Sequence, residues 1–498
     1  MKQPDASDYV VGIAGCGAMG QGIAQVSVQG GMRTLLFDAR EGGAAAAKDQ
    51  IAGRIERLVE KGRIGEDDAK AAIDRLEPVA DLKGLAPCDC VVEAVFEDLD
   101  VKHGLFRDLE SVVGPDCILA SNTSSIPLAS IARVCERRGR VAGLHFFNPV
   151  PLMKLVEVIR AAETSDETVA ALMALGQRMT RVPVEVKDSP GFLVNMGGRA
   201  YTTEALRIVH EGVAEPHQVD AIMRDCWGFR MGPFELMDLT GIDVNYPVSG
   251  IIYDGYKQDR RLATSANHMA MFDAGLFGRK TGQGWYAYEK GQPKDRPSAD
   301  FETDAAPVRM VQVAGPNPDL RAFAEEIGLT IGDSGPVLAA PMGLDATSLA
   351  VRAKQDHRML ACLDLMGDTS KRVTMMTAPG ADREALAGVA AAIIASGRAV
   401  TCINDSPGFV GPRMVAMIGN LGCYMAEIGL ASPEDIDTAM QLGLNYPQGS
   451  ISLVERLGVP NTQRILEMLQ AITGDDRYRP TLWLRRRALL GLGAHTPN

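Results

Sequence analysis

A glycine-rich turn near the start of the chain constrains its fold more than any other feature. The apolar residues 9–14 lead directly into Gly15, Gly17 and Gly20, which form the pattern G-x-G-x-x-G. In this pattern the first glycine permits a tight turn, the second lets the backbone approach a pyrophosphate, and the third lets a helix pack on the strand. The diphosphate then lies at the N-terminus of that helix. We therefore expect a dinucleotide to be bound by Gly15, Gly17, Ala18, Met19 and Gly20.

An acidic residue follows at the end of the next apolar run. Residues 34–37 are Thr-Leu-Leu-Phe, and Asp38 comes 18 positions after Gly20. A carboxylate at this place accepts hydrogen bonds from the adenosine ribose and would repel a 2′-phosphate. The sequence therefore favours NAD over NADP as the cofactor. Arg40, two residues later, weakens this preference because a guanidinium group suits a phosphate.

Length and composition limit the classes of protein to which this chain can belong. With 498 residues it is too long for one core, and we expect roughly three or four domains. Hydrophobic residues make up 46% and charged residues 23%, as in an ordinary soluble globular protein. The net charge of -12, without a long basic run, disfavours nucleic acids and anionic membrane surfaces as partners.

We expect neither a targeting segment nor a membrane span. Residues 1–8 are polar, unlike a signal peptide, and the longest apolar run, at about 386–396, is too short to cross a bilayer. The nine cysteines are scattered, and their one close pair, Cys88 and Cys90, lacks metal-ligand spacing. This pattern is typical of reduced thiols in a cytoplasmic protein, so we expect neither disulfides nor a metal site.

Hydrophobic patterns divide the chain into regions of different fold class. Over residues 1–187, strand and helix patterns alternate from residue 9 onward, which is typical of a doubly wound, parallel, Rossmann-type sheet. The expected strands are 9–14, 33–38, 89–95, 117–121, 140–145 and 182–186. A long helix, roughly residues 40–61, is expected to project between the second and third strands. Strand patterns then fade, and residues 188–288 are expected to form a first all-helical C-terminal domain.

Part of the chain is repeated. Asp-Ser-Pro-Gly-Phe at 188–192 recurs at 405–409, and the segment from Gly228 recurs in weaker form from Gly443, at nearly the same offset. Two ordered matches at nearly equal offset indicate a duplicated helical domain. The remaining regions are expected to be a linker at 289–320, a truncated, degenerate Rossmann-like α/β remnant at 321–400, and the second all-helical domain at 401–498. The remnant has no glycine-rich turn, so we do not expect it to bind a dinucleotide.

His145 is the candidate general base. Oxidation of a secondary alcohol with NAD removes a hydride from carbon and a proton from oxygen, and the proton needs a base that titrates near neutral pH. Histidine side chains, with an unperturbed pKa of about 6.5, suit this task. His145 ends a predicted strand at the sheet edge where doubly wound folds bind ligands. From its position alone, a structural histidine that only caps the strand is an equal alternative.

Three further polar positions accompany this base. Glu157 lies within the apolar run 155–159, where a carboxylate is costly unless paired, and an imidazolium would supply the partner. The alternative is an edge-strand glutamate that faces water. Hydroxyls of residues 121–125 could orient a substrate alcohol or only cap a helix. The Asn195 amide, at the start of the helical region, could donate to a thioester carbonyl or likewise serve as a cap.

Seven ordered motifs in this chain resemble those of the 3-hydroxyacyl-CoA dehydrogenases. They are G-x-G-x-M-G-x-G-I-A at 15–24, V-E-A-V-F-E at 92–97, S-N-T-S-S at 121–125, G-L-H-F-F-N-P-V-P-L-M-K-L-V-E at 143–157, D-S-P-G-F at 188–192, M-G-P-F-E-L at 231–236 and K-T-G-Q-G-W-Y at 280–286. The full length, with its second helical copy, resembles the long bacterial members of this family, in which the C-terminal domain is duplicated.

This resemblance implies NAD-dependent, reversible oxidation of (S)-3-hydroxyacyl-CoA to 3-oxoacyl-CoA. His145 would be the base, with Glu157 orienting it and stabilising its protonated form. Ser124 would bond to the 3-hydroxyl group, and Asn195 to the thioester side of the substrate. The residues around the nicotinamide half of NAD would be Glu97, Lys102, Asn122, Asn148 and Lys280. Lys61, on the projecting helix, matches a CoA-contacting lysine only loosely, and a solvated lysine is the alternative.

The second copy departs from the family pattern. The segment that should contain the histidine reads Cys-Leu-Asp-Leu-Met from Cys362 to Met366, and Thr374 falls about where Glu157 would. We therefore expect no catalysis in the second copy. Short members of the family pair helical domains between subunits, so two such domains in one chain are expected to form an internal pseudo-dimer. A homo-oligomer of the whole chain is also open.

Three other functions are compatible with parts of this pattern. A β-hydroxyacid dehydrogenase would need a helical lysine four residues before Asn195, but position 191 is glycine and Lys187 lies before the helical region. A non-catalytic nucleotide-binding scaffold is disfavoured because the residues expected to catalyse are all present. A multifunctional fatty-acid oxidation protein would carry a hydratase domain, for which no segment is left.

Overall fold

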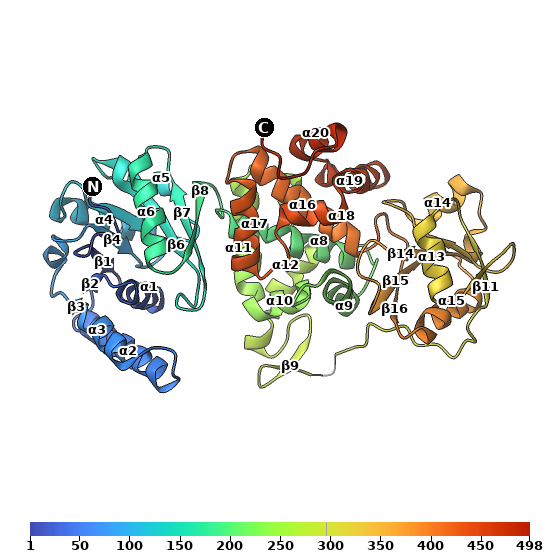
Figure 1. The fold of residues 1–498 in the computed structure, drawn as a ribbon, viewed down its shortest axis with the longest axis horizontal. Helices are drawn as coiled ribbons and strands as arrows, with labels where there is room; N and C mark the ends of the chain where they lie inside the picture. Colours follow the sequence, from blue (N-terminus) through green and yellow to red (C-terminus); the bar gives the residue numbers. More distant parts are fainter. Residues whose placement is uncertain (295) are drawn as a thin grey trace. The chain divides into compact units, whose positions relative to one another are not determined.

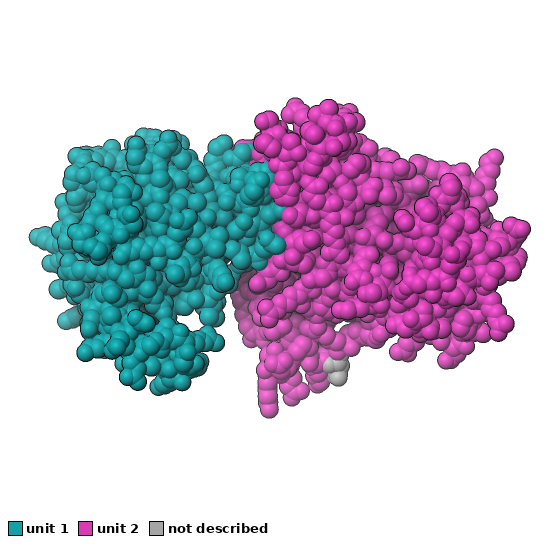
Figure 2. Space-filling view, viewed as in Figure 1, with its two compact units in different colours: residues 1–196, 429–444 teal, residues 197–428, 445–498 magenta. Residues whose placement is uncertain are grey.

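The computed structural model describes residues 1–294 and 296–498. The chain divides into two compact units, which are coloured separately in Figure 2. Unit 1 comprises residues 1–196 and 429–444, and unit 2 comprises residues 197–428 and 445–498. A short segment from late in the sequence therefore belongs to the unit that is otherwise N-terminal.

Unit 1 is built on an eight-stranded sheet with the order β3-β2-β1-β4-β5-β6-β7-β8. The strands are β1 (Val10–Ala14), β2 (Arg33–Phe37), β3 (Leu76–Pro78), β4 (Cys90–Glu93), β5 (Ile118–Ser121), β6 (Val141–Phe146), β7 (Leu155–Arg160) and β8 (Val182–Lys187). The central strands are buried along their whole length, as expected when helices cover both faces of a parallel sheet. This confirms the Rossmann-like sheet that the alternating pattern predicts.

Helices of unit 1 connect these strands. They are α1 (Ala18–Gln29), α2 (Gly43–Glu60), α3 (Glu66–Asp74), α4 (Leu99–Val112), α5 (Leu128–Ala132), α6 (Asp166–Arg178), the start of α7 (Val194–Gly197), and α17 (Pro433–Leu444). Figure 1 shows α2 and α3 side by side, projecting from the sheet near β3. The long helix expected at 40–61 is thus α2, which begins after Gly42 in the left-handed region (φ 70°).

Two strands of this sheet, β3 and β7, are not among the strands expected from the sequence. The short strand β3 contains the residues Leu-Glu-Pro, too little apolar character for a strand signal. Strand β7 pairs with β6 antiparallel, whereas the other pairings in this sheet are parallel. The expectation of a purely parallel sheet was therefore wrong at this pair. Residues 147–154, between β6 and β7, are too few for a crossover helix, so the chain has to turn back.

Unit 2 contains a second, six-stranded sheet with the order β12-β11-β13-β14-β15-β16. Its strands are β11 (Met310–Val313), β12 (Thr330–Ile331), β13 (Val337–Ala339), β14 (Leu360–Asp364), β15 (Arg372–Thr377) and β16 (Ala399–Ile403). The helices between these strands are α13 (Pro318–Glu326), α14 (Ala346–Ala353) and α15 (Arg383–Ala395). The pair β14–β15 is antiparallel and precedes a parallel last strand, as β6–β7 does in the first sheet.

The second sheet begins earlier in the sequence than the pattern indicates. Strand β11 and the start of α13 lie within 289–320, the interval expected to be a linker. The same interval holds the strand β10 (Gln292–Lys294), which pairs with β9 (Ala287–Glu289), and residue 295, which lies outside the described residues. Strands β9, β10, β11 and β12 are only two to four residues long, so they leave little periodic signal in the sequence.

The rest of unit 2 is helical. The helices are α8 (Arg199–His210), α9 (Pro216–Trp227), α10 (Pro233–Thr240), α11 (Ile242–Gly255), α12 (Ala266–Asp273), α16 (Gly411–Glu427), α18 (Ser450–Leu457), α19 (Val459–Thr473) and α20 (Leu482–Leu490). Helix α8, from the first helical region, packs against α16, from the second. Across residues 1–294 and 296–498, no helix combines the length and apolar character needed to cross a membrane.

A buried ion cluster joins α8 to the second helical region. Glu204 is fully buried, and its carboxylate accepts hydrogen bonds from Arg413 Nε and Arg477 Nε, both at 2.7 Å. The Tyr478 hydroxyl donates to the same carboxylate at 2.9 Å. Burial alone would raise the pKa of Glu204, but the charges of the two arginines outweigh it and lower the pKa to about 2. The cluster therefore ties together segments that are far apart in sequence.

We predict that Glu204→Gln lowers the free energy of unfolding at pH 7 by about 3–5 kcal/mol, because two buried guanidinium groups lose the carboxylate that they share. Glu77→Gln, which breaks the half-exposed pair with Arg33, is the control and should cost at most about 1 kcal/mol. Urea unfolding followed by circular dichroism measures both. Equal stability of parent and Glu204→Gln would contradict the role of the cluster.

The same cluster predicts a pH dependence. The folded-state pKa of Glu204 lies below its ordinary value of 4.5, so its stabilisation is complete above that value and is lost as the pH falls toward 2. The stability difference between parent and Glu204→Gln should therefore shrink as the pH falls from 4.5 to 2. A difference that stays constant over this range would show that the carboxylate charge is not what stabilises the cluster.

Candidate active site

The glycine-rich turn lies between β1 and α1. Gly15 has φ 101°, a conformation that favours glycine. A Cβ on Gly20 would overlap the Gly15 carbonyl oxygen, so the helix can start here only with glycine at this position. A Cβ on Gly17, the N-cap of α1, would meet no atom within 4 Å. The first turn of α1 has no acidic residue that would repel an anion. The positive end of the helix dipole and the open space at Gly17 therefore suit a pyrophosphate.

Asp38 follows β2 beside this turn. Its Oδ2 accepts a hydrogen bond from the Cys16 backbone N–H at 2.9 Å. The side chain of Arg40 donates from Nε to Oδ1 at 2.9 Å and from Nη2 to Oδ2 at 3.1 Å. These Arg40 hydrogen bonds are the main reason that the pKa of Asp38 falls to about 2. The carboxylate is therefore ionised, and the Arg40 side chain is its partner.

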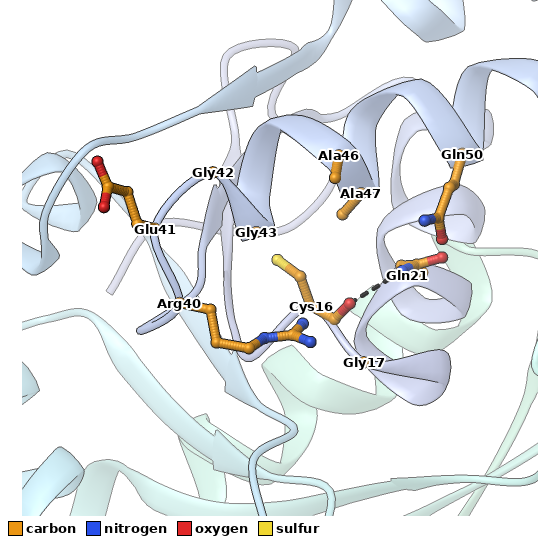
Figure 3. A pocket seen from close by; sticks show the side chains of 10 residues that line it. All are labelled: Cys16, Gly17, Gln21, Arg40, Glu41, Gly42, Gly43, Ala46, Ala47 and Gln50. Carbon is orange, nitrogen blue, oxygen red and sulfur yellow. Dashed lines mark hydrogen bonds between the residues drawn. The ribbon is translucent and has the colours of Figure 1, made fainter.

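A cavity of about 500 Å³ lies between the glycine turn and the start of α2. Figure 3 shows the Arg40 guanidinium directed toward the turn formed by Cys16 and Gly17, and the Gln21 side chain bonded to the Cys16 carbonyl at 2.9 Å. This volume is within the range of small-molecule sites, about 300–1,000 Å³. The open space at Gly17, the cavity and the ionised Asp38 together fit the phosphate and ribose parts of a dinucleotide.

His145 and Glu157 form a buried pair across β6 and β7. They are directly opposed in the antiparallel register, and His145 Nδ1 lies 2.7 Å from Glu157 Oε2. The side chains are 7% and 1% exposed. An ionised carboxylate only accepts hydrogen bonds, so a neutral imidazole that donates from Nδ1 to Glu157 would have Nε2 as an acceptor. The edge-strand alternative for Glu157, with the side chain in water, is wrong.

The second oxygen of Glu157 is held by a turn after β8. Oε1 accepts hydrogen bonds from the backbone N–H groups of Leu193 and Val194, at 3.1 and 2.9 Å. These residues follow the Asp-Ser-Pro-Gly-Phe motif, in which Gly191 (φ 77°) and Phe192 (φ 48°) are in the left-handed region. Asn195, which is partly buried, comes next in sequence. The motif thus orients the carboxylate and brings Asn195 close to the pair.

Residues at the ends of β4 and β5 form a second polar group. Glu97 Oε1 accepts hydrogen bonds from the Thr123 hydroxyl at 2.6 Å and from the backbone N–H of Ser124 at 2.9 Å. The exposed Ser124 hydroxyl lies 3.5 Å from the same oxygen. Burial would raise the pKa of Glu97, but these hydrogen bonds and the charge of Lys102 lower it. Asn122 Oδ1 accepts the Phe146 backbone N–H at 2.8 Å, next to His145.

Glu93 is a further carboxylate of this group, and it is not among the site residues expected from the sequence. Its side chain is fully buried and accepts hydrogen bonds from Lys102 Nζ and the Ser121 hydroxyl, both at 2.6 Å. Lys102, 1% exposed, also lies 3.3 Å from Glu97. Lys102 therefore connects the buried Glu93 to Glu97. Glu93 follows two buried valines of β4, so its position in an apolar run is a signal of the same kind as that of Glu157.

The other expected site residues lie at the surface. Asn148 is exposed and precedes Pro149 through a cis peptide bond. Lys61 is exposed at the C-terminal end of α2. Lys280 belongs to unit 2, where its ammonium group pairs with Asp243 at 2.5 Å. Among the described residues no hydrogen bond or ion pair links Lys61 to His145, and Lys280 and His145 belong to different units.

The second sheet has lost the base and its partner. Asp364 of β14 and Thr374 of β15 are directly opposed, as His145 and Glu157 are in β6 and β7. Both are buried, and burial raises the pKa of Asp364 to about 6. The Thr374 hydroxyl has no hydrogen-bond partner among the described residues. The register therefore confirms that a carboxyl and a hydroxyl stand where the imidazole and carboxylate would be.

Family models match about three quarters of the chain, and residues 289–407 lie outside the matches. The 3-hydroxyacyl-CoA dehydrogenase NAD binding domain matches residues 10–189. The 3-hydroxyacyl-CoA dehydrogenase C-terminal domain matches twice, at residues 191–288 and 408–497. The double match agrees with the repeat of the Asp-Ser-Pro-Gly-Phe motif.

Full-length and shorter relatives give the same result. A 3-hydroxyadipyl-CoA dehydrogenase of Escherichia coli K12 is 38% identical over 483 residues, 97% of this chain and 98% of that protein. The crystal structure of a 3-hydroxybutyryl-CoA dehydrogenase from Escherichia coli K12 has a TM-score of 0.87 and 36% identity, over 97% of this chain and 98% of that one. A (S)-3-hydroxybutyryl-CoA dehydrogenase from Ralstonia eutropha has a TM-score of 0.55 and 36% identity, over 57% of this chain and 100% of that one. The chain therefore belongs to the 3-hydroxyacyl-CoA dehydrogenase family.

Proposed function

We propose that this NAD-dependent enzyme interconverts (S)-3-hydroxyacyl-CoA and 3-oxoacyl-CoA with His145 as the general base. The hydrogen bond of 2.7 Å between His145 and Glu157 carries the proposal, because it leaves Nε2 as a proton acceptor. The names of the full-length relatives support the substrate class. Bound NAD supplies the hydride acceptor for the oxidation.

The buried pair accounts for the proton transfer. In the oxidative direction, His145 Nε2 takes the proton of the 3-hydroxyl group, and the ring becomes an imidazolium whose charge faces Glu157. An ion pair in a site with little water is stabilised more than one in solvent. The two backbone N–H groups that hold Glu157 keep the carboxylate from turning away. In the reductive direction the imidazolium returns the proton to the oxygen.

The remaining polar residues are proposed to orient the substrate and cofactor. The Ser124 hydroxyl would bond to the 3-oxygen, and the Asn195 amide to the thioester side of the substrate. Glu97, Asn122, Asn148 and Lys280 would surround the nicotinamide half of NAD. Lys102, which is buried against Glu97 and Glu93, would fix the position of Glu97. Lys61 on α2 would contact the CoA moiety.

We also propose the arrangement of domains. A Rossmann-type domain (1–187) and a helical domain (188–288) would be followed by a degenerate remnant and a second helical domain (401–498). The remnant would begin with β11, inside the interval expected to be a linker (289–320), and end at about residue 400. The packing of α8 on α16 and the buried cluster around Glu204 support an internal pseudo-dimer of the helical copies. Nine free cysteines, eight of them buried, support a cytoplasmic protein.

His145→Gln tests the base assignment. We predict that it lowers kcat for acetoacetyl-CoA reduction by about 100-fold or more, because a positioned base supplies at least this factor, and leaves NADH binding unchanged. Stopped-flow absorbance at the NADH band measures the rate. His103→Gln is the matched control, because His103 is also buried in unit 1 but bonds to the Ser130 carbonyl. A folded His145→Gln enzyme that works at the parent rate would refute the proposal.

Gly17→Ala tests the cofactor turn. The added methyl group meets no protein atom, so the melting temperature should stay at the parent value. NADH binding should weaken about tenfold or more, because the methyl group lies where the pyrophosphate approaches. Gly20→Ala, which collides with the Gly15 carbonyl, should instead lower the melting temperature. Fluorescence titration with NADH and thermal unfolding distinguish the two, and parent-like binding by Gly17→Ala would exclude this turn from the cofactor site.

Asp38→Ala tests the preference for NAD. Removing the carboxylate abolishes its repulsion of a 2′-phosphate and releases Arg40, which it now holds. We predict that the ratio of kcat/KM for NADPH to that for NADH rises about tenfold or more. The double variant Asp38→Ala with Arg40→Ala should lose most of this gain. An unchanged ratio in Asp38→Ala would show that neither residue sets the preference.

A further inference from the structure

Residues 429–444 come from the second helical copy in sequence but belong to unit 1. Helix α17 contacts β7 and β8, and the Leu430 carbonyl accepts a hydrogen bond from the Lys187 backbone N–H at 2.9 Å. Strand β7 carries Glu157. A segment of the second helical copy therefore packs on β7, the strand whose Glu157 bonds to His145.

A hydrogen bond that corresponds to the one between Lys187 and Leu430 joins the second sheet to the first helical copy. The Asn404 backbone N–H donates to the Val213 carbonyl at 2.9 Å. The repeat that relates residues 188–192 to 405–409 also relates Lys187 to Asn404 and Val213 to Leu430, so the two hydrogen bonds correspond. Helix α9 contacts β15 as α17 contacts β7. Each helical copy thus supplies a helix to the opposite sheet, the reciprocal pattern of a two-fold related pair.

Gly443 is the point at which α17 approaches the buried pair. A Cβ on Gly443 would lie 2.9 Å from Val194 Cγ2 and 3.0 Å from Leu155 Cδ2. The Val194 N–H donates to Glu157 Oε1, and Leu155 lies two residues before Glu157, on the same face of β7. The missing side chain at position 443 therefore lets the helix rest on both neighbours of the carboxylate.

The corresponding contact in the second sheet is different. Gly411 corresponds to Val194 under the same repeat, and a Cβ there would collide with the indole Nε1 of Trp227, at the end of α9. Trp227 is fully buried, and its Nε1 also lies near Gly367. The indole of Trp227 thus fills the space between the helix α9 and Gly411. Beside His145 and Glu157, Gly443 of α17 instead lies against Val194.

We propose that Gly443 is a positioning residue for the reaction. By resting on Val194 and Leu155, α17 holds the turn that donates to Glu157, and Glu157 in turn holds His145. The inference rests on the proposed function of the His145–Glu157 pair. The second helical copy thereby contributes to the reaction at the first sheet, although the second sheet has no histidine at the corresponding position.

Gly443→Ala tests this inference. Alanine is favoured over glycine in a helix by about 1 kcal/mol, so a loss of activity reports the contact and not the helix. We expect kcat for acetoacetyl-CoA reduction to fall about tenfold or more, because small displacements of catalytic groups are costly. The KM for NADH should stay within about twofold of the parent value, because uniform cofactor binding is not altered. A purely structural effect would not separate kcat from KM in this way.

Two further variants make the test specific. Gly422→Ala, in α16, places a Cβ 2.6 Å from Ser450 Cβ, a crowded contact within the second helical copy that touches no residue around Glu157. It should leave kcat at the parent value. Adding Val194→Ala to Gly443→Ala removes the Cγ2 atom that the new methyl group meets, and should restore kcat toward the parent value.

Parent-like kcat in Gly443→Ala, or a loss that Val194→Ala does not relieve, would overturn the inference. If Gly443→Ala does not fold, the double variant is compared with Val194→Ala alone. A higher kcat in the double variant supports the inference, and an equal kcat overturns it. His145→Gln, measured in parallel, separates the two proposals: if it is inactive while Gly443→Ala is parent-like, the base assignment stands and only the role of α17 fails.

Discussion

The site depends on one hydrogen bond, from His145 to Glu157, made between two strands that run in opposite directions. Antiparallel pairing puts residues directly opposite each other with their side chains close together, so the imidazole and carboxylate are in direct contact. The reversal at residues 147–154 is therefore what brings base and acid together. The turn at Leu193 and Val194 then satisfies the second carboxylate oxygen, so the buried charge has hydrogen-bond partners on both sides.

Much of unit 1 could be predicted from the sequence because its signals are local. The glycine turn, the strands with buried apolar runs and the aspartate after β2 all follow from patterns a few residues long. Strand β7 was not among the expected strands, and its direction could not be predicted, since an apolar strand reads the same in either direction. Glu93 was missed although it lies among valines as Glu157 does. The link between Lys102 and Glu93 also escaped prediction, because it joins a strand end to the following helix in three dimensions.

The assignment of α17 to unit 1 could not have been predicted from periodicity either. An amphipathic pattern shows that a helix has an apolar face, but not which of two similar sheets that face will cover. The duplicated motif did predict that the helical copies are related. It left open that each copy places a helix on the sheet of the other, which became visible only in the corresponding hydrogen bonds of Lys187 and Asn404. Loss of the base from the second sheet, as seen at Asp364 and Thr374, left this exchange intact.

The central claim is that His145 exchanges a proton with the substrate while Glu157 holds it in place. A crystal structure of the enzyme with NADH and acetoacetyl-CoA tests this claim most directly. The account predicts that His145 Nε2 lies within about 3.2 Å of the 3-oxygen of the substrate, with Nδ1 still bonded to Glu157. A substrate bound with its 3-oxygen out of reach of His145, and closer to another titratable side chain, would contradict it.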